Sequence, residues 1–570
     1  METTSKKYLD QIRKELNEFD WAAATITCTN LIEEIFSTEI TYEIDDFFQI
    51  MKQLRRKRRF ALMVRLGDAL SITSRTNFSI RNLYAQSLIE QGYFTSGISV
   101  LEKLELEMNS NGKNSTQEYF ETQGILGRAY KQLFIRTGYS KSETAVKFLE
   151  KSIEYYIQVY KNDSKIHTWH GINAVALLAM AERHKILSIS SLGDYEVLAK
   201  EILSNIEEKE NKSTADAWHF ATASECCLAL KDYDEALKWL AGYSSQEDCD
   251  AFELASTLRQ FEEVWELSMD EKSGQILMPL LRAELLRRSG GEFEMDPEDI
   301  RKELSLAKKV TSQYENLVEE DTGYSHSKSK LEKVFGEDSF RTYKWYMQGA
   351  ARCLAVARIG LDSSRGEGTG FLVKGNSLHE SLGEELFLLT NSHVISDDPL
   401  EKALSPKEAI VIFEVLNPNL EFKLSEIVWS SPSTELDASL VRFSVQDNQK
   451  LVELTKNIEW YPLTDTLPLG EDQKVYIIGH PRGGTLQLSF QDNHLLDHQD
   501  PLIHYRTPTD NGSSGSPIFN RTWMLLGLHH AGSDEMQCLN GKEGNYSANE
   551  GIYIQAIIAA LSKKLDPKTD

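Results

Sequence analysis

The run Thr509-Asp510-Asn511-Gly512-Ser513-Ser514-Gly515-Ser516-Pro517, in the last fifth of the chain, constrains the fold most strongly. Glycine at 512 permits a tight turn in which the N–H groups of Gly512 and Ser514 point into one small pocket. Two such donors can stabilise the oxyanion of a tetrahedral intermediate. Clusters of glycine and serine are also typical of flexible turns, so the run alone leaves both interpretations open.

Two upstream segments supply the partners that a serine nucleophile requires. A serine hydroxyl reacts only when a histidine accepts its proton and a carboxylate orients that histidine. An apolar run over 387–389 leads through a short polar turn to His393, and Asp437 precedes an alternating apolar run over 438–443. Each residue alone also fits a structural role, His393 as a core histidine and Asp437 as a turn residue that opens a strand. Together with Ser514, they predict a catalytic triad.

Five motifs resemble successive landmarks of the chymotrypsin-fold, trypsin-like serine proteases, in the branch of glutamyl endopeptidases and HtrA proteases. The motifs are Gly368-Thr369-Gly370-Phe371-Leu372-Val373, Leu389-Thr390-Asn391-Ser392-His393-Val394, Leu436-Asp437-Ala438-Ser439-Leu440-Val441, Gly479-His480-Pro481 and Gly512-Ser513-Ser514-Gly515-Ser516-Pro517. Their order of His, Asp and Ser is that of the chymotrypsin architecture. The resemblance implies an all-β domain of two six-stranded barrels. It also implies that His393 is the general base, Asp437 its orienting acid and Ser514 the nucleophile, with an oxyanion hole made by Gly512 and Ser514.

Thr509 and His529 give a hint about the substrate pocket. Glutamyl endopeptidases carry a small hydroxyl and a histidine at matching positions. A hydroxyl and an imidazole can both bind a carboxylate, and the imidazole can carry positive charge. We therefore expect a preference for Glu or Asp before the cut bond, with small or neutral residues as the alternative. Pro508, which stands where trypsin carries an aspartate, argues against Lys or Arg.

The preceding residues, up to about 345, are predicted to be all-α. They contain few prolines, and their apolar residues recur at spacings of three and four. Paired stretches such as Leu83 to Leu104, with Gly92 and Tyr93 at the turn, are similar to tetratricopeptide units. We expect a multidomain chain: a TPR-like helical region over 1–110, a helical regulatory platform over 111–345 and a protease domain over 350–570.

A second resemblance lies within the helical part. Gly127-Arg128-Ala129-Tyr130-Lys131 and His170-Gly171-Ile172-Asn173-Ala174-Val175-Ala176-Leu177-Leu178 are similar to the TRAF-binding region of apoptosis signal-regulating kinases. The resemblance implies a regulatory platform beside an effector enzyme. The structural alternative is that Gly171 and Asn173 merely set a helix junction.

Composition excludes several classes of partner. The net charge of −25 disfavours nucleic acid as a general partner. No apolar run is long enough to span a bilayer, and the polar N-terminus is unlike a signal peptide, so we expect no membrane partner and a cytoplasmic location. The six cysteines show no disulfide or zinc spacing. We expect no cofactor and no metal, and interpret His494, Asp497, His498 and Asp500 as a polar loop.

The sequence thus predicts a cytoplasmic serine endopeptidase that cleaves protein substrates through an acyl-enzyme. The helical repeats would bind a regulatory or activating protein that gates or recruits the protease, because a solenoid offers a large concave surface. A role in stress or phage-defence signalling follows from the pairing of domains. The alternative is a non-catalytic scaffold in which a protease-like barrel only binds peptides.

Overall fold

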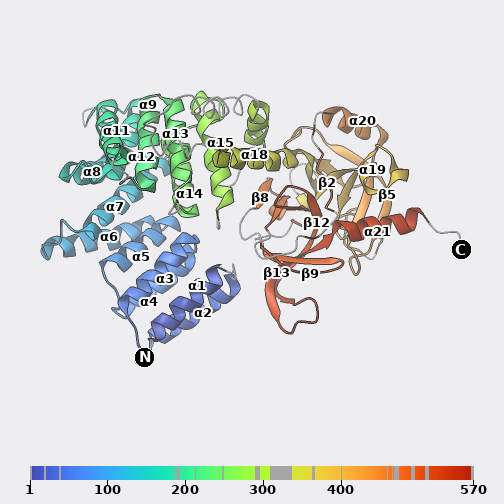
Figure 1. Cartoon of the computed structure of the whole chain (residues 1–570), viewed down its shortest axis with the longest axis horizontal. Coiled ribbons are helices and arrows are strands. Elements are labelled where there is room, and N and C mark those ends of the chain that lie inside the picture. Colours follow the sequence, from blue (N-terminus) through green and yellow to red (C-terminus); the bar gives the residue numbers. More distant parts are fainter. Residues whose placement is uncertain are drawn as a thin grey trace. The chain divides into compact units, whose positions relative to one another are not determined.

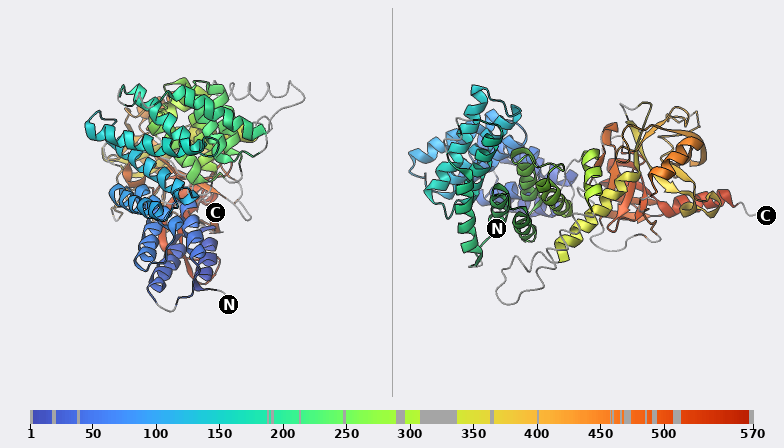
Figure 2. Two further views of the ribbon diagram at one scale, coloured as in Figure 1. Left: turned by 90° about the vertical axis from the view of Figure 1, so that its left-hand side faces the viewer. Right: turned by 90° about the horizontal axis from the view of Figure 1, so that it is seen from above.

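The computed structural model describes residues 3–17, 21–37, 40–186, 189, 193–211, 214–246, 249–288, 296–307, 337–362, 366–399, 401–456, 458, 460–464, 467, 474–484, 486–489, 494–506 and 513–566. The chain divides into two compact units. The first, the helical unit, comprises Met1–Gly290 with Val310–Thr342, and the second, the β-unit, comprises Gly291–Lys309 with Tyr343–Asp570. All described strands belong to the β-unit (Figures 1 and 2).

The helical unit is a succession of antiparallel helix pairs (Figure 1). Its helices are α1 (Thr4–Asn17), α2 (Trp21–Ile35), α3 (Ile44–Arg56), α4 (Phe60–Ile72), α5 (Phe78–Glu90), α6 (Phe94–Ser110), α7 (Gln117–Arg136), α8 (Glu143–Asn162), α9 (Thr168–Arg183), α11 (Tyr195–Asn211), α12 (Ala217–Ala229), α13 (Tyr233–Ser244), α14 (Ala251–Arg259) and α15 (Lys272–Arg287). A π-helical turn, η1 (Gln260–Val264), extends α14. The predicted helical-repeat architecture is confirmed.

The pair α5 and α6 shows why these sequences form repeats. The Asn77 side chain caps α5 by accepting the Ile80 N–H at 2.8 Å. Gly92 adopts a φ of +82° between the two helices, a conformation that glycine tolerates best. Leu101 and Leu104 are fully buried, as a packing face of a repeat should be. The turn that the sequence predicts at Gly92 is therefore confirmed.

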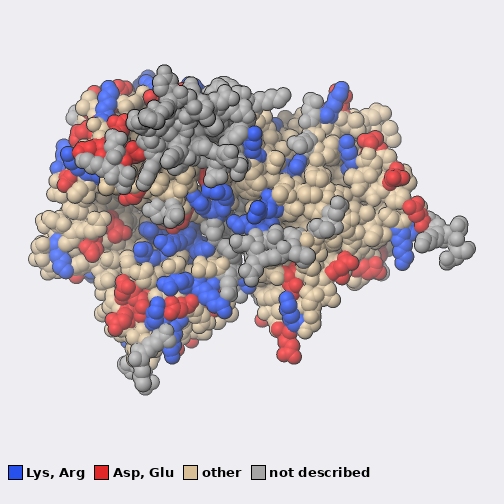
Figure 3. Space-filling view, viewed as in Figure 1, with Lys and Arg blue, Asp and Glu red and all other residues tan. Residues whose placement is uncertain are grey.

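The basic stretch 52–59 lies against aromatic rings of its own unit. The Arg55 guanidinium lies 5.0 Å from the Phe252 ring centroid, and that of Arg59 lies 3.6 Å from the Trp21 ring. Basic and acidic side chains are interspersed over the visible face of the helical unit (Figure 3). Arg55 and Arg59 of this stretch thus take part in cation–π packing within the unit.

The β-unit contains two sheets. The first is a closed barrel with strand order β1-β2-β3-β6-β5-β4, built from β1 (Val356–Gly360), β2 (Gly366–Lys374), β3 (Leu386–Thr390), β4 (Ile410–Ile412), β5 (Phe422–Ser431) and β6 (Ala438–Phe443). The second has order β8-β7-β11-β12-β13-β10-β9, from β7 (Val475–Gly479), β8 (Gln487–Ser489), β9 (His494–Gln499), β10 (Leu502–Arg506), β11 (Pro517–Asn520), β12 (Leu525–Gln537) and β13 (Asn545–Tyr553). The predicted all-β architecture is confirmed, although the second sheet has seven strands among its described residues where six were expected. The interpretation of residues 494–498 as a loop is wrong, because they belong to strand β9.

Helices complete the β-unit. They include α18 (Glu337–Arg352), whose residues from 343 onward belong to this unit, α20 (Val445–Leu454) and α21 (Ile554–Leu565), which packs on β12 and β13. The Trp345 and Trp523 rings lie 5.3 Å apart, and the Trp523 indole N–H donates to the Trp345 carbonyl at 2.8 Å. The C-terminal part of α18 is therefore built into the β-unit, ahead of its first strand.

Replacing Gly349 with alanine should destabilise the β-unit. A Cβ at this position would lie 2.3 Å from a ring atom of the fully buried Trp523, which cannot move away without disturbing its neighbours. We expect a loss of roughly 1–3 kcal/mol, seen as a lower midpoint of thermal unfolding. The exposed Gln348 on the same helix is the control, because Gln348→Ala should leave the midpoint unchanged. An unchanged midpoint for Gly349→Ala would contradict this packing.

Among the helices of the described residues, none has the length and apolarity needed to cross a membrane.

Candidate active site

The pairing of β3 with β6 brings His393 and Asp437 together. Thr390 at the end of β3 lies opposite Ser439 at the start of β6, so the turn after β3 meets the residue before β6. The His393 Nδ1 and the Asp437 Oδ2 are 2.6 Å apart, and the His393 backbone N–H donates to the Asp437 Oδ1 at 3.0 Å. The Ser392 hydroxyl donates to the same Oδ1 at 2.9 Å. The carboxylate thus fixes both the ring and the backbone of His393.

Asp437 is a buried anion whose charge is stabilised by its donors. Its side chain is fully buried, and its φ of +41° is one that aspartate tolerates better than most residues. Burial alone would raise the pKa of Asp437, but the hydrogen bonds from His393 and His530 outweigh it and hold the pKa well below its usual value. Asp437 therefore remains ionised at neutral pH and can orient an imidazole.

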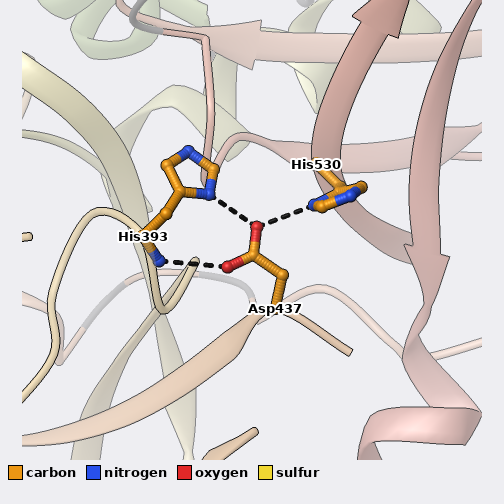
Figure 4. A group of neighbouring side chains, drawn as sticks. All are labelled: His393, Asp437 and His530. Carbon is orange, nitrogen blue, oxygen red and sulfur yellow. Dashed lines mark hydrogen bonds and ion pairs between the residues drawn. The ribbon is translucent and has the colours of Figure 1, made fainter. Parts of the chain in front are cut away.

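His530 is a second histidine on the same carboxylate, and the sequence analysis did not identify it. Its Nδ1 lies 2.7 Å from the Asp437 Oδ2, and the two imidazoles approach that oxygen from two sides (Figure 4). Its Nε2 lies 3.5 Å from the Glu550 Oε1. The ligand atoms of His393, Asp437 and His530 all lie within 4.8 Å of one another, as in a metal site. The hydrogen bonds account for this closeness, because each Nδ1 faces the carboxylate.

The loop that carries Ser514 is anchored to both sheets. The Ser514 carbonyl accepts from the Thr369 N–H of β2 at 2.9 Å, and the Gly515 N–H donates to the His529 carbonyl of β12 at 3.1 Å. Gly515 has a φ of +86°, and a Cβ there would lie 2.0 Å from the Thr369 carbonyl oxygen. Only glycine fits this approach, which explains the Ser-Gly pair at 514–515.

Ser514 is partly exposed, as a nucleophile must be. No hydrogen bond joins its hydroxyl to His393, although both residues are described. In free enzymes this bond is often long and tightens only when a substrate binds. The Ser514 N–H likewise makes no hydrogen bond to another described residue. Gly512, the other expected oxyanion donor, lies outside the described residues, as does Thr509.

His529 is buried beside the Ser514 loop. Its Nδ1 lies 2.6 Å from the Tyr505 hydroxyl. Burial, reinforced by the nearby charges of His530 and His393, lowers the pKa of His529 to about 3. The expectation that this imidazole carries positive charge is therefore not supported at neutral pH. It would recognise a substrate carboxylate only by donating a hydrogen bond.

The charge of His530 predicts a pH-dependent contribution to stability. Burial would lower the pKa of His530, but its hydrogen bond to Asp437 and the charges of Asp437 and Glu550 raise it. A group with a raised folded-state pKa stabilises the fold fully below its unfolded pKa of about 6.5, and this contribution is lost as the pH rises through the folded value. His530→Gln keeps a donor for Asp437 without the charge. We expect this variant to lower the unfolding midpoint more at about pH 6 than at about pH 9.

His498→Gln is the control for that measurement, because the His498 ring makes no hydrogen bond to another described residue. Its effect on the midpoint should be small at both pH values. Equal losses for His530→Gln at the two pH values would show that His530 does not act on Asp437 as a cation.

Comparisons with known proteins match two parts of the chain to known families. Residues 368–528 match the family model of the trypsin-like peptidase domain, and residues 59–178 match that of Tetratricopeptide Repeats-Sensor. The chain therefore contains a C-terminal trypsin-like peptidase domain and an N-terminal tetratricopeptide sensor region. The narrower resemblances, to glutamyl endopeptidases and HtrA proteases and to apoptosis signal-regulating kinases, stay predictions.

The chain is also similar to individual proteins. It is 26% identical over 274 residues to the uncharacterized protein y4fB of Sinorhizobium fredii, and this match covers 41% of the chain and only 40% of that relative. Among solved structures, it is similar to the inactive form of the Rv3671c protease (15% identity, TM-score 0.24, covering 38% of this chain and 91% of that one). It is also similar to the serine endoprotease from Yersinia pestis (18% identity, TM-score 0.26, covering 39% and 67%).

Proposed function

We propose that the chain is a serine endopeptidase in which Ser514 attacks the substrate carbonyl, His393 accepts the serine proton and later protonates the leaving amine, and Asp437 holds His393 in place. The observation that supports it most is the buried, ionised Asp437 bound to both the ring and the backbone of His393. With Nδ1 bound to the carboxylate, the Nε2 of His393 is left to exchange protons with the nucleophile. Water then hydrolyses the acyl-enzyme on Ser514.

We further propose that Gly512 and Ser514 supply the oxyanion hole, and that Thr509 and His529 favour an acidic residue before the cut bond. Because His529 stays neutral, this preference would depend on hydrogen bonds to the carboxylate. A panel of peptides that differ only in that residue, with Glu, Asp, Ala and Arg, tests it. Faster cleavage after Glu and Asp is expected, whereas efficient cleavage after Arg alone would overturn the preference but not the peptidase activity.

The helical unit is proposed to gate or recruit the protease by binding a regulatory or activating protein, in stress or phage-defence signalling within the cytoplasm. The sensor family match supports a regulatory role, and the six free cysteines fit a reducing compartment. The rate of fluorophosphonate labelling should be compared between the full chain and a fragment from 291 to 570, which includes the whole β-unit. Faster labelling of the fragment would support gating by the helical unit. Equal rates would argue against gating and support recruitment of the protease by a bound protein.

The non-catalytic alternative, in which the β-unit only binds peptides, is equally consistent with the absence of a hydrogen bond between the Ser514 hydroxyl and His393, both of which are described. The two functions differ in one measurement. A peptide-binding scaffold would bind the peptides of the panel without cutting them, whereas a peptidase would release both products.

A further inference from the structure

A buried polar network lies where the two motifs at 127–131 and 170–178 meet. Lys131 of α7 donates to the Asn173 Oδ1 of α9 at 3.1 Å and to the Gln260 Oε1 at 2.6 Å. The Gln260 side-chain amide in turn donates to the carboxylate of Glu225 on α12 at 3.2 Å. All four side chains are buried. Asn173 therefore does more than set a helix junction, because it binds a buried lysine of the other motif.

Burying charged and polar side chains in this way costs desolvation free energy. Burial lowers the pKa of Lys131 and raises the pKa of Glu225. Buried ionic groups seldom add stability over an apolar replacement of the same shape. The network also includes the first residue of the π-helical turn η1, and π-helical turns are rare and frequent at functional sites. These features indicate that the network serves binding.

The network borders a cavity of about 60 Å³ that has unused hydrogen-bond donors. The hydroxyls of Tyr156 on α8 and Ser256 on α14 line it, are buried, and have no hydrogen-bond partner among the described residues. Tyr156 is fully buried, so its hydroxyl has no access to bulk solvent. An unpaired buried hydroxyl costs free energy, which an incoming acceptor would recover.

Each of the two carboxylates that line this cavity accepts hydrogen bonds through its Oε2. Glu225 accepts from the Trp265 indole N–H at 2.8 Å, and Glu263 accepts from the Gln132 side-chain amide at 2.7 Å. Arg128 also lines the cavity and pairs with Glu90 at 2.6 Å. Three cationic side chains, those of Arg128, Lys131 and Arg259, line the cavity beside these two carboxylates and the two unpaired hydroxyls, and this excess of donors suits an anionic group.

A second, more open cavity of about 220 Å³ shares two walls with the first. Trp169 and Trp218 line both cavities, with their rings 6.2 Å apart at an angle of 74°. Indole faces stack well on flat rings. The smaller cavity has room only for a small polar group, whereas the larger one has room for a ring.

We propose that these two cavities bind one small molecule that carries an anionic group and a flat ring. The anionic group accepts hydrogen bonds from Tyr156, Ser256 and Lys131, and the ring lies against Trp169 and Trp218. That this molecule controls proteolysis rests on the proposed function. The binding is measured without protease activity. A failure of the ligand-binding proposal can therefore be told apart from a failure of the proposed peptidase function.

Isothermal titration of the full chain carrying Ser514→Ala, which prevents self-cleavage, tests the proposal. The probes are AMP and benzoate, with adenosine and benzyl alcohol as uncharged counterparts. At least one charged probe should bind, and its counterpart should bind at least about tenfold more weakly. Binding of AMP alone identifies a nucleoside phosphate as the ligand class, and binding of benzoate alone identifies an aromatic acid. No binding of either charged probe at millimolar concentration overturns the proposal.

Two matched variants on α8 separate binding from a structural role. Tyr156→Phe removes the unpaired hydroxyl, so we expect affinity for the bound probe to fall about tenfold or more while the unfolding midpoint of the free chain is unchanged or higher. Tyr160→Phe removes a hydroxyl that donates to Glu201 at 3.0 Å, so its midpoint should fall by about 2 °C with affinity unchanged. Unchanged affinity in Tyr156→Phe would overturn the proposal, whatever its midpoint.

Discussion

Ser514→Ala is expected to lower the turnover of a cleavable peptide by about a millionfold, because removal of the nucleophile leaves only binding and oxyanion stabilisation. The measurement is the release of a fluorogenic leaving group over hours at high enzyme concentration. Ser514 is the partly exposed serine of its loop, whereas the neighbouring Ser513 is buried.

Ser513→Ala is the matched control, since it removes a hydroxyl from the same loop without touching the proposed nucleophile. Its turnover should stay within about tenfold of the unchanged chain. If Ser514→Ala kept more than about a thousandth of the original rate, Ser514 would not be the nucleophile.

Asp437→Asn should lower turnover about ten-thousandfold while the chain still folds. The carboxylate accepts hydrogen bonds from His393, Ser392 and His530. An amide replaces one acceptor oxygen with a donor, which forces His393 into the wrong tautomer. The loss should appear in kcat, as measured on the best peptide of the panel.

Asp497→Asn is the control for that variant, because Asp497 is an aspartate of the same unit that pairs with Lys542 and lies on β9. Its turnover should be close to that of the unchanged chain. A kcat for Asp437→Asn within tenfold of that value would contradict the role assigned to Asp437.

The sequence predicted that His393 and Asp437 lie at the ends of apolar strands, and the structure shows that the antiparallel pairing of β3 with β6 brings those ends together. The sequence was not sufficient for His530. The ladder between β12 and β13 shifts register between His529 and Ala531. At this bulge the adjacent side chains of His529 and His530 have different surroundings. His529 is buried beside Tyr505, and His530 reaches Asp437. No sequence pattern reveals the position of such a bulge.

In the helical unit as well, the sequence predicted contacts between residues that are close in the chain but not contacts between distant residues. Periodicity and the Gly92 turn predicted the pair α5 and α6, since these depend on neighbours in the chain. The contact of Lys131 with Gln260 joins residues 129 positions apart and depends on how successive repeats stack. The two short motifs contain Lys131 and Asn173, but only the stacking shows that these residues form one network.

The β-unit also contains two helical segments that lie outside its sequence motifs. The motifs begin at Gly368, yet the unit includes the end of α18, where Trp345 packs on Trp523. It also includes residues 297–307, which are helical, and there Glu303 accepts a hydrogen bond from the Tyr346 hydroxyl at 2.5 Å. Helical periodicity assigned both segments to the helical part, because a sequence pattern gives the type of an element and not the core that it joins.

Covalent labelling by a fluorophosphonate tests the central claim most directly, because the reagent modifies a serine only when a histidine has activated it. The full chain and the 291–570 fragment should be labelled, digested and analysed by mass spectrometry, with His393→Ala as the control. We expect an adduct on Ser514 in at least one of the two forms and none in His393→Ala. A folded chain and a folded fragment that both lack the Ser514 adduct, or equal labelling of His393→Ala, would contradict the account.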